Sequence, residues 1–253
     1  MFGAICKNYF ASKVLKIKAS DMYVVSVMPC TAKKYEASRA ELSQDNIADV
    51  DISITTRELA RMIKKAGIDF VNLENTEFDN PMGDSTGAAN IFGATGGVLE
   101  AALRTAYEWV TDKELDKVEF LAVRGIDGIK EATINIYGTD INVCVANTLG
   151  NAKKVMEEVR SGNSKYHIIE IMACPGGCVG GAGQPLHHGN FDIVKKRIEG
   201  LYSIDKNKAI RKSHKNPSII YLYEDFLGEP YGDIAHELLH TNYYDKSNTY
   251  ACE

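Results

Sequence analysis

The sequence predicts an α/β fold because short apolar runs of strand composition alternate with segments of helical periodicity along its 253 residues. Two cysteine-containing loops, residues 29–36 and 173–185, each follow directly on one of these runs. In open α/β sheets, ligands gather at the carboxyl ends of the strands. We therefore expect one large domain or two lobes, with a functional site assembled from loops at the edge of the sheets.

The composition is that of a globular protein without a nucleic-acid partner. Hydrophobic residues make up 45% of the chain and the formal net charge is -5, whereas surfaces that bind nucleic acid are basic. No apolar run reaches the roughly 20 residues of a membrane span, and the first residues lack the pattern of a signal peptide. We expect a cytoplasmic protein whose six cysteines are too sparse for a disulfide scaffold.

The first third of the chain predicts a helix, a strand and a second helix. Residues 1–19 show helical spacing of apolar side chains, and residues 23–28 form a β-rich run. The second helix is expected over 55–66, beginning at Thr55 or Thr56 and stopped by the next glycine. The apolar members of the first helix are Phe2, Ile5, Phe10 and Leu15.

Residues 84–97 are rich in small side chains and lead into a helix expected over 98–109. Small side chains let the backbone approach a ligand or a neighbouring element closely. The glycines follow neither the phosphate-loop nor the dinucleotide-binding pattern, which argues against nucleotide binding. Phe92 is the large apolar group of this loop, placed either at a ligand or in the core.

The second half of the chain again alternates strands with a helix. Strands are expected at 118–123, 141–146 and 167–172, and an amphipathic helix at 148–160. Cys144 lies inside one of these strands and is expected to be a buried, unreactive thiol. Residues 203–217, rich in lysine and asparagine, are expected to form an exposed connection.

Residues 170–185 place Cys174 and Cys178 in a glycine-rich loop. This spacing lets both sulfurs bind one centre, and the glycines let the backbone close around a bulky inorganic group. A structural zinc turn or a disulfide loop is the alternative. Zinc hairpins, however, use closer cysteines and a matching second pair, which the sequence lacks. The pattern favours an iron-sulfur site.

Cys30 stands at the end of the strand predicted at 23–28, where a ligand role is favoured over the usual buried thiol. Lys33, three residues later, could supply a positive charge to an anionic cluster, and Glu36 is placed to pair with it. A simply solvated lysine is the alternative interpretation.

Residues 236–240 match the zinc-protease pattern H-E-x-x-H, with His236 and His240 as ligands and Glu237 as base. No histidine follows His240 to serve as the third ligand. The alternative, an amphipathic helix with Leu238 and Leu239 facing inward, is therefore favoured.

Residues 28–36 and 170–178 resemble the second and third signature motifs of the iron-only (FeFe) hydrogenases. Both family patterns, Met-Pro-Cys-x-x-Lys-x-x-Glu and Glu-x-Met-Ala-Cys-x-x-Gly-Cys, are complete. Residues 85–104 and 237–241 also look like this family, so the resemblance covers essentially the whole chain. It implies a two-lobed catalytic domain with twisted sheets flanked by helices, in which the H-E-x-x-H segment is a family helix.

The resemblance implies a cofactor, the H-cluster, in which a 4Fe-4S cubane is joined through one thiolate to a two-iron unit with carbonyl, cyanide and dithiolate ligands. Cys30 and Cys174 would bind the cubane, and Cys178 would bind it while bridging to the two-iron unit. Pro29 and Gly177 count among the cofactor-binding residues of the same two motifs.

The resemblance also implies roles for side chains that are not iron ligands. Lys33 would hydrogen-bond an iron cyanide, and Glu36 of the same motif is grouped with it among the catalytic residues. An apolar wall around the two-iron unit would be formed by Met28, Met172 and Phe92.

The family's first motif, Thr-Ser-Cys-Cys-Pro, is absent from the sequence, and neither Cys6 nor Cys252 has its flanking residues. In the family this motif supplies the fourth cubane ligand and a cysteine that passes protons. Ferredoxin-like cluster motifs are absent as well. We expect residues 1–253 to form an incomplete H-cluster domain, with the N-terminal part missing and no ferredoxin-like domain.

The implied activity is the reversible reduction of protons to dihydrogen, with electrons from ferredoxin or an NAD(P)-linked partner subunit and with maturation proteins as further partners. The alternative is a hydrogenase-like iron-sulfur protein that binds a cluster for sensing or cluster assembly without turnover.

Overall fold

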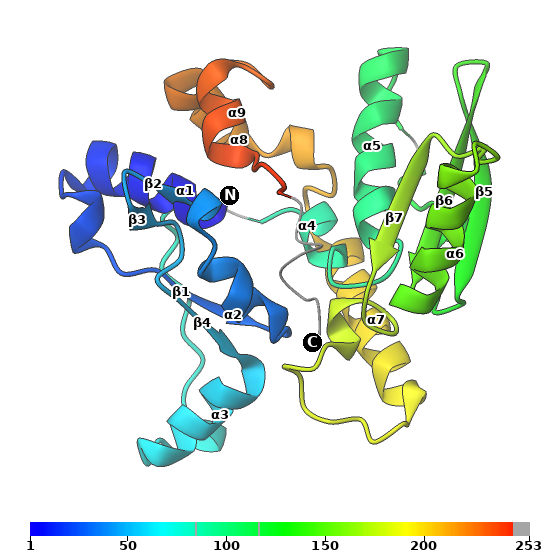
Figure 1. The fold of residues 1–253 in the computed structure, drawn as a ribbon. Coiled ribbons are helices and arrows are strands. Elements are labelled where there is room, and N and C mark those ends of the chain that lie inside the picture. Colours follow the sequence, from blue (N-terminus) through cyan, green and yellow to red (C-terminus); the bar gives the residue numbers. More distant parts are fainter. Residues whose placement is uncertain (84, 116, 245–253) are drawn as a thin grey trace, which may run out of the picture. The chain divides into compact units, whose positions relative to one another are not determined.

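The computed structural model describes residues 1–83, 85–115 and 117–244, which form an α/β fold in two compact units (Figure 1). The first unit comprises Met1–Met28, Ala32–Ile54 and the chain from Tyr221 onward, and the second comprises Pro29–Thr31 and Thr55–Ile220. The predicted α/β class is confirmed. All three cysteines of the two predicted loops belong to the second unit.

The first unit combines short helices with two small sheets. Strand β1 pairs with β4, and β2 pairs with β3 in an antiparallel hairpin. Its elements are α1 (Phe2–Ile5), a π-helix (Cys6–Leu15), 3₁₀ turns (Ala19–Asp21 and Ala40–Leu42), β1 (Val25–Met28), α2 (Ala32–Ala37), β2 (Ser43–Gln44), β3 (Ile47–Ala48), β4 (Ile52–Thr55), a second π-helix (Tyr223–Leu227) and α9 (Asp233–Leu239). Helix α8 (Pro217–Leu222) joins the two units along the chain.

The helix predicted at 1–19 runs from Phe2 to Leu15, but its buried face differs from the predicted one. Phe2 is 61% exposed and Leu15 46% exposed, whereas Ile5 and Tyr9 are buried. The π-helical stretch, residues 6–15, has more residues per turn than an α-helix. Apolar residues spaced for 3.6 residues per turn, such as Leu15, therefore do not all face the core. Lys7 on the buried face pairs with Asp51 at 2.8 Å.

The second unit is built on a three-stranded sheet of order β5-β6-β7. Strands β5 (Ile129–Ile136) and β6 (Thr139–Asn147) form an antiparallel hairpin, and β7 (Ile168–Met172) lies parallel to β6. Helix α6 (Leu149–Arg160) makes the crossover between the parallel strands. Strand β7 thus delivers the cysteine loop at its carboxyl end, as predicted.

Alternate residues of β6 pack on opposite faces of this sheet, as expected for a strand covered on both sides. Val143 and Val145 pack with Leu99 and Leu103 of α5 (Gly97–Thr111). On the other face, Cys144 packs with Val155 of α6. Figure 1 shows the sheet between α5 and α6. Cys144 is fully buried, which confirms its predicted position in a strand interior.

One strand predicted in the middle of the chain is wrong. Residues 118–123 form no strand among the described residues there; instead they end in a 3₁₀ turn at Leu121–Val123. The side chain of Val123 packs in the same core as Leu99 and Leu103 of α5. Strand β6 pairs with β5 on one side and β7 on the other, so residues 118–123 do not pair with it. The sequence analysis missed β5 altogether.

The expected exposed connection at 203–217 is also wrong. Helix α7 (Phe191–Asn207) runs into this segment and carries Asp205, which is fully buried. Lys212 and Asn216 are buried as well. Charged residues enter the interior here because ion pairs with α5 compensate their burial.

The remaining helices of the second unit are α3 (Thr56–Lys65) and α4 (Gly87–Ile91). Helix α3 confirms the helix predicted at 55–66. Thr55 and Glu58 form a reciprocal capping box at its start. In the described parts of the chain, no helix is long and apolar enough to cross a membrane.

Acid is expected to weaken the second unit through Glu108 of α5, whose side chain is 7% exposed. Burial alone would raise the pKa of Glu108, but hydrogen bonds from the Leu115 amide, Lys212 and His214 hold it at about 2. A lowered pKa contributes stability above the ordinary value near 4.5, and this contribution is lost as the pH falls toward 2.

Urea unfolding at a series of pH values between 6 and 3 checks this expectation. Wild type should lose more stability over that interval than Glu108→Gln, which carries no titrating carboxyl at this position. Parallel pH profiles for the two proteins would show that Glu108 contributes nothing to acid sensitivity.

Candidate functional site

The cysteine loop, residues 173–185, turns twice directly after β7 and presents one cysteine at each turn. The carbonyl of Cys174 accepts a hydrogen bond from the Gly177 amide at 3.0 Å. Cys178 then begins a 3₁₀ turn, in which its carbonyl accepts from the Gly181 amide at 2.9 Å. Both cysteines are partly exposed.

Cys30 is held beside this loop by its neighbour Pro29. The Pro29 carbonyl accepts a hydrogen bond from the Gly183 amide at 2.9 Å. A β-carbon on Gly181 would lie only 2.1 Å from the same oxygen, so only glycine permits this approach. The structure therefore brings the Cys30 segment against the cysteine loop within the second unit.

Residues 92–96 form a third wall against the same loop. The Gly93 carbonyl accepts from the Val179 amide, and the Thr95 amide donates to the Gly176 carbonyl, both at 3.1 Å. The close approach by backbone that the small residues of 84–97 predict is confirmed here. We call the segments 29–31, 92–96 and 173–185 the cysteine cradle.

The donors of the cradle suit a metal cluster better than a single metal ion. Thiolates are the ligands that iron-sulfur clusters use, with each cysteine binding a separate iron. Among the residues that the structure describes, no three His, Cys, Asp or Glu side chains are grouped to hold one metal ion. The cradle supplies thiol donors on backbone segments that hydrogen bonds hold together, which is the donor type of an iron-sulfur cluster.

Two other cysteines lie buried, where the neutral thiol is favoured over the thiolate that binds metal. Burial raises the pKa of Cys6 in the first unit. Burial also raises the pKa of Cys144 in β6 to about 11. A thiol must lose its proton to bind metal. Cys252 lies outside the described residues.

The first unit contains the other predicted residues of the second motif. Lys33 donates to both carboxylate oxygens of Glu36, at 2.6 and 2.5 Å, which is the ion pair that the sequence analysis expected. Their side chains are 40% and 45% exposed. Met28, Lys33 and Glu36 line one small cavity of about 80 Å³ in this unit.

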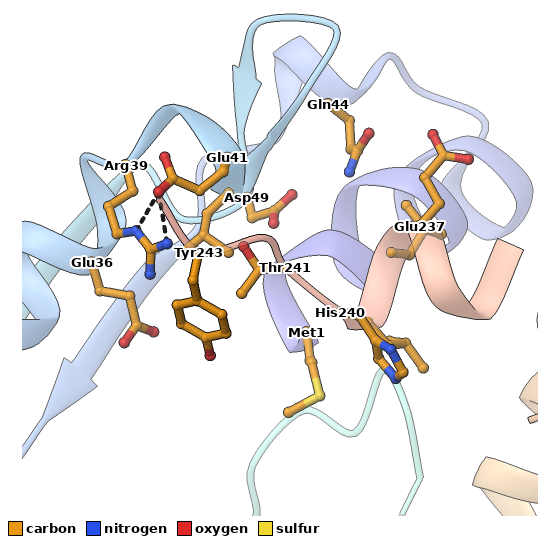
Figure 2. Close-up of a pocket in the computed structure, with 13 residues that line it drawn as sticks. Met1, Glu36, Arg39, Glu41, Gln44, Asp49, Glu237, His240, Thr241 and Tyr243 are labelled. Carbon is orange, nitrogen blue, oxygen red and sulfur yellow. Dashed lines mark hydrogen bonds and ion pairs between the residues drawn. The ribbon is translucent and has the colours of Figure 1, made fainter. Parts of the chain in front are cut away.

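Glu36 also lines a larger cavity of the first unit, of about 470 Å³. Figure 2 shows the carboxylates of Glu36, Glu41, Asp49 and Glu237 around it, together with Arg39. The Arg39 guanidinium pairs with Glu41 at 2.6 Å. None of the three cysteines of the cradle lines this cavity.

Phe92 and Met172, the remaining predicted apolar residues, lie in the second unit. Phe92 is the first residue of the cradle segment 92–96, and Met172 directly precedes the cradle segment 173–185. Met172 is the last residue of β7 and is half-buried. Phe92 is 44% exposed, which excludes a place in the core of this unit.

The H-E-x-x-H segment forms α9, as the helix interpretation predicts. Leu238 is buried and Leu239 half-buried. The rings of His236 and His240 lie 4.9 Å apart, and no third ligand joins them among the described residues.

Two arginines that the sequence analysis missed hold the cysteine loop from outside. Arg197 of α7 donates to the carbonyls of Val179 and Pro185, both at 2.9 Å. Arg57 of α3 donates to the Ala182 carbonyl at 2.7 Å. No local pattern marks these arginines, since their partners are 12 to 125 residues away in the chain.

Two family models match consecutive parts of the chain. Residues 1–182 match the model described as iron only hydrogenase large subunit, C-terminal domain. Residues 191–246 match the model described as iron hydrogenase small subunit. The boundary between the two matches falls just before α7.

Several known proteins are similar over nearly the whole chain. It is 53% identical over 246 residues to the NADP-reducing hydrogenase subunit HndD of Solidesulfovibrio fructosivorans, covering 97% of this chain and 42% of that protein. It is 45% identical over 249 residues to iron hydrogenase 1 of Clostridium pasteurianum, covering 96% and 43%. A cytosolic Fe-S cluster assembly factor of Xenopus tropicalis is 29% identical over 252 residues, covering 96% and 52%.

The fold agrees with these likenesses. A solved FeFe-hydrogenase of Chlamydomonas reinhardtii superposes with a TM-score of 0.80 at 43% identity, covering 96% of this chain and 68% of that one. The chain spans less than half the length of the two hydrogenases compared above. With a family model matched over residues 1–182, the chain belongs to the family of C-terminal domains of iron-only hydrogenase large subunits.

Proposed function

We propose that the protein is the H-cluster-binding part of an FeFe hydrogenase that reversibly reduces protons to dihydrogen. The observation that carries this proposal is the cysteine cradle, in which backbone hydrogen bonds hold the segments of all three motif cysteines together. Identities of 45% and 53% to proteins named as hydrogenases support the same reaction.

In this proposal, Cys30, Cys174 and Cys178 would hold the cubane, and Cys178 would also hold the two-iron unit. Pro29 and Gly177 shape the backbone that closes around the cluster. When bound, the H-cluster would relay electrons from an external donor and supply the iron site for proton reduction. The proposal assigns no role on the cubane to Cys6 or Cys144, since both are buried and burial raises the pKa of both thiols.

The proposal also carries over the roles that the family resemblance implies for the other predicted residues. Lys33, whose Nζ donates to Glu36, would offer a hydrogen bond to an anionic ligand of the cofactor. Met28, Met172 and Phe92 would form the apolar wall that the resemblance implies for the two-iron unit.

We further propose that electrons arrive from ferredoxin or an NAD(P)-linked subunit and that maturation proteins insert the two-iron unit. The relative named as an NADP-reducing hydrogenase subunit supports an electron-transfer partner. A cytoplasmic location suits Cys6, Cys30, Cys144 and Cys174, which are free thiols and persist in a reducing compartment.

Cluster assembly without turnover is the second candidate function. The relative named as a cytosolic Fe-S cluster assembly factor favours it, although at 29% identity against 53% for the hydrogenase subunit. Full-length protein isolated with its cofactor separates the two functions. A hydrogenase evolves hydrogen from reduced viologen, measured by gas chromatography, whereas an assembly factor evolves none and transfers its cluster to an apo-ferredoxin.

Replacing Cys174 tests the cradle itself. Anaerobic reconstitution with iron, sulfide and a small thiol should load wild type with about four irons per chain and give a cluster EPR signal on reduction. Cys174→Ala should lose both, because one corner of the cluster has no protein ligand.

Cys144→Ala is the matched control, since it removes a cysteine that lies in the sheet rather than in the cradle. It should load like wild type. Wild type that takes up no iron would overturn the proposed function for this chain, and Cys174→Ala that loads fully would show that the ligands are assigned wrongly.

A further inference from the structure

Glu170, the first residue of the third motif, has no role in the chemistry described so far. It lies on β7, four residues before Cys174, and is 9% exposed. Its carboxylate accepts two backbone hydrogen bonds, from the Gly96 amide at 2.6 Å and the Leu99 amide at 2.7 Å.

These two amides belong to the start of α5, where the first N–H groups of a helix lack partners within the helix. Gly96 is the N-cap residue and has no side chain to accept them. Glu170 takes this role from a different element, with its negative charge at the positive end of the helix. Burial raises the pKa of Glu170, while the backbone amides and the charge of Lys130 oppose that shift.

The hydrogen bond between Glu170 and Gly96 lies next to the cradle in the chain, because residue 95 belongs to the cradle segment 92–96. Thr95, next to Gly96, donates its amide to the Gly176 carbonyl of the cysteine loop. The chain from Glu170 to Gly176 and the pair Thr95-Gly96 therefore close a ring through two hydrogen bonds. Cys174 lies inside the closed stretch, so its position depends on both ties.

We propose that Glu170 is a positioning residue for the iron-sulfur cluster: by capping α5 from β7, it sets where residues 92–96 hold the cysteine loop. This inference rests on the proposed cluster function. It assigns Glu170 no contact with the cluster and no proton transfer.

Glu170→Gln tests the proposal because glutamine keeps the size but offers one acceptor oxygen and a competing NH₂ donor. In iron-free protein, hydrogen exchange should quicken at the amides of Gly96 and Leu99. It should also quicken at the Gly177 and Val179 amides, whose partners lie in the cradle. In reconstituted protein, a chelator should extract iron at least about tenfold faster, with a changed EPR line shape.

Glu108→Gln is the matched control, a buried glutamate near the other end of α5 that also accepts a backbone amide, from Leu115. It should lower stability without changing iron extraction, the EPR line shape or exchange in the cysteine loop. A general loss of stability would affect both variants alike.

The outcomes separate the two claims. Wild type that binds no iron overturns the proposed function, while exchange in the iron-free variant still tests the positioning. Exchange that quickens at Gly96 and Leu99 but not at Gly177 and Val179 overturns the positioning role, and so does iron extraction at the wild-type rate.

Discussion

Replacing Arg104 by leucine is expected to lower the free energy of unfolding of the second unit by about 3–5 kcal/mol. Arg104 is fully buried and pairs with Glu100 and Asp205, each at 2.8 Å. Removing it leaves two buried carboxylates short of a cation. Arg124 still pairs with Glu100 and Arg211 with Asp205, so the loss should fall toward the lower end of that range.

This pair also joins the two parts of the chain that match different family models. Arg104 lies in the part that matches the large subunit, and Asp205 in the part that matches the small subunit. The buried ion pair therefore helps to hold α7 on α5. In Arg104→Leu, protease should cut near α7 before the sheet unfolds.

Urea unfolding followed by the fluorescence of Trp109, the single tryptophan, measures the loss within the second unit. Lys153→Ala is the control, because it removes an exposed pair with Glu157 whose N···O distance is 4.0 Å. Such a pair contributes at most about 0.5 kcal/mol. An equal, small effect of the two substitutions would mean that the buried network adds nothing to stability.

Replacing Gly177 by alanine is expected to abolish cluster loading and to destabilise the second unit by more than about 2 kcal/mol. Gly177 has φ +94° and ψ −160°, a conformation that is essentially restricted to glycine. A β-carbon there would lie 2.6 Å from the Thr95 amide nitrogen and 2.8 Å from the Gly93 carbonyl oxygen. The backbone of residues 92–96 would have to move away from the cysteine loop.

Gly138→Ala separates backbone strain from this clash. Gly138 has φ +85° in the β5-β6 hairpin, and a β-carbon there meets no atom within 4 Å. This control should lose about 1 kcal/mol and load iron normally. Thermal unfolding and iron analysis of Gly177→Ala and Gly138→Ala compare the two effects. A Gly177→Ala protein that loads a full cluster would contradict the cradle as described.

Local sequence pattern was sufficient where the physical cause is local. The capping box at Thr55, the strand that leads into Cys174 and the Lys33-Glu36 pair all involve residues close together in the chain. Apolar and polar residues alternate over much of 129–136, and this pattern, which the sequence analysis did not use, predicts strand β5. Small residues at 84–97 likewise predicted a close backbone approach, which the hydrogen bonds of Gly93 and Thr95 confirm.

Interactions between distant residues could not be predicted in this way. Arg104 and Asp205 are 101 residues apart, and Glu170 and Gly96 are 74 apart. The lysines and asparagines near residue 205 resemble those of a solvated loop, because composition does not reveal that an arginine from another helix compensates a buried carboxylate. The π-helical stretch, residues 6–15, changes the helical period itself, so the spacing of apolar residues did not predict that Leu15 is exposed.

Residue type and short spacing were enough to predict the α/β class, the three candidate cysteine ligands and the glycines around them. The folded chain adds two facts that these patterns do not contain: the segments 29–31 and 92–96 close against the cysteine loop, and Glu170 ties that loop to α5. These contacts involve backbone N–H and C=O groups, which nearly every residue carries. A pattern of side chains therefore cannot predict which of these groups will pair.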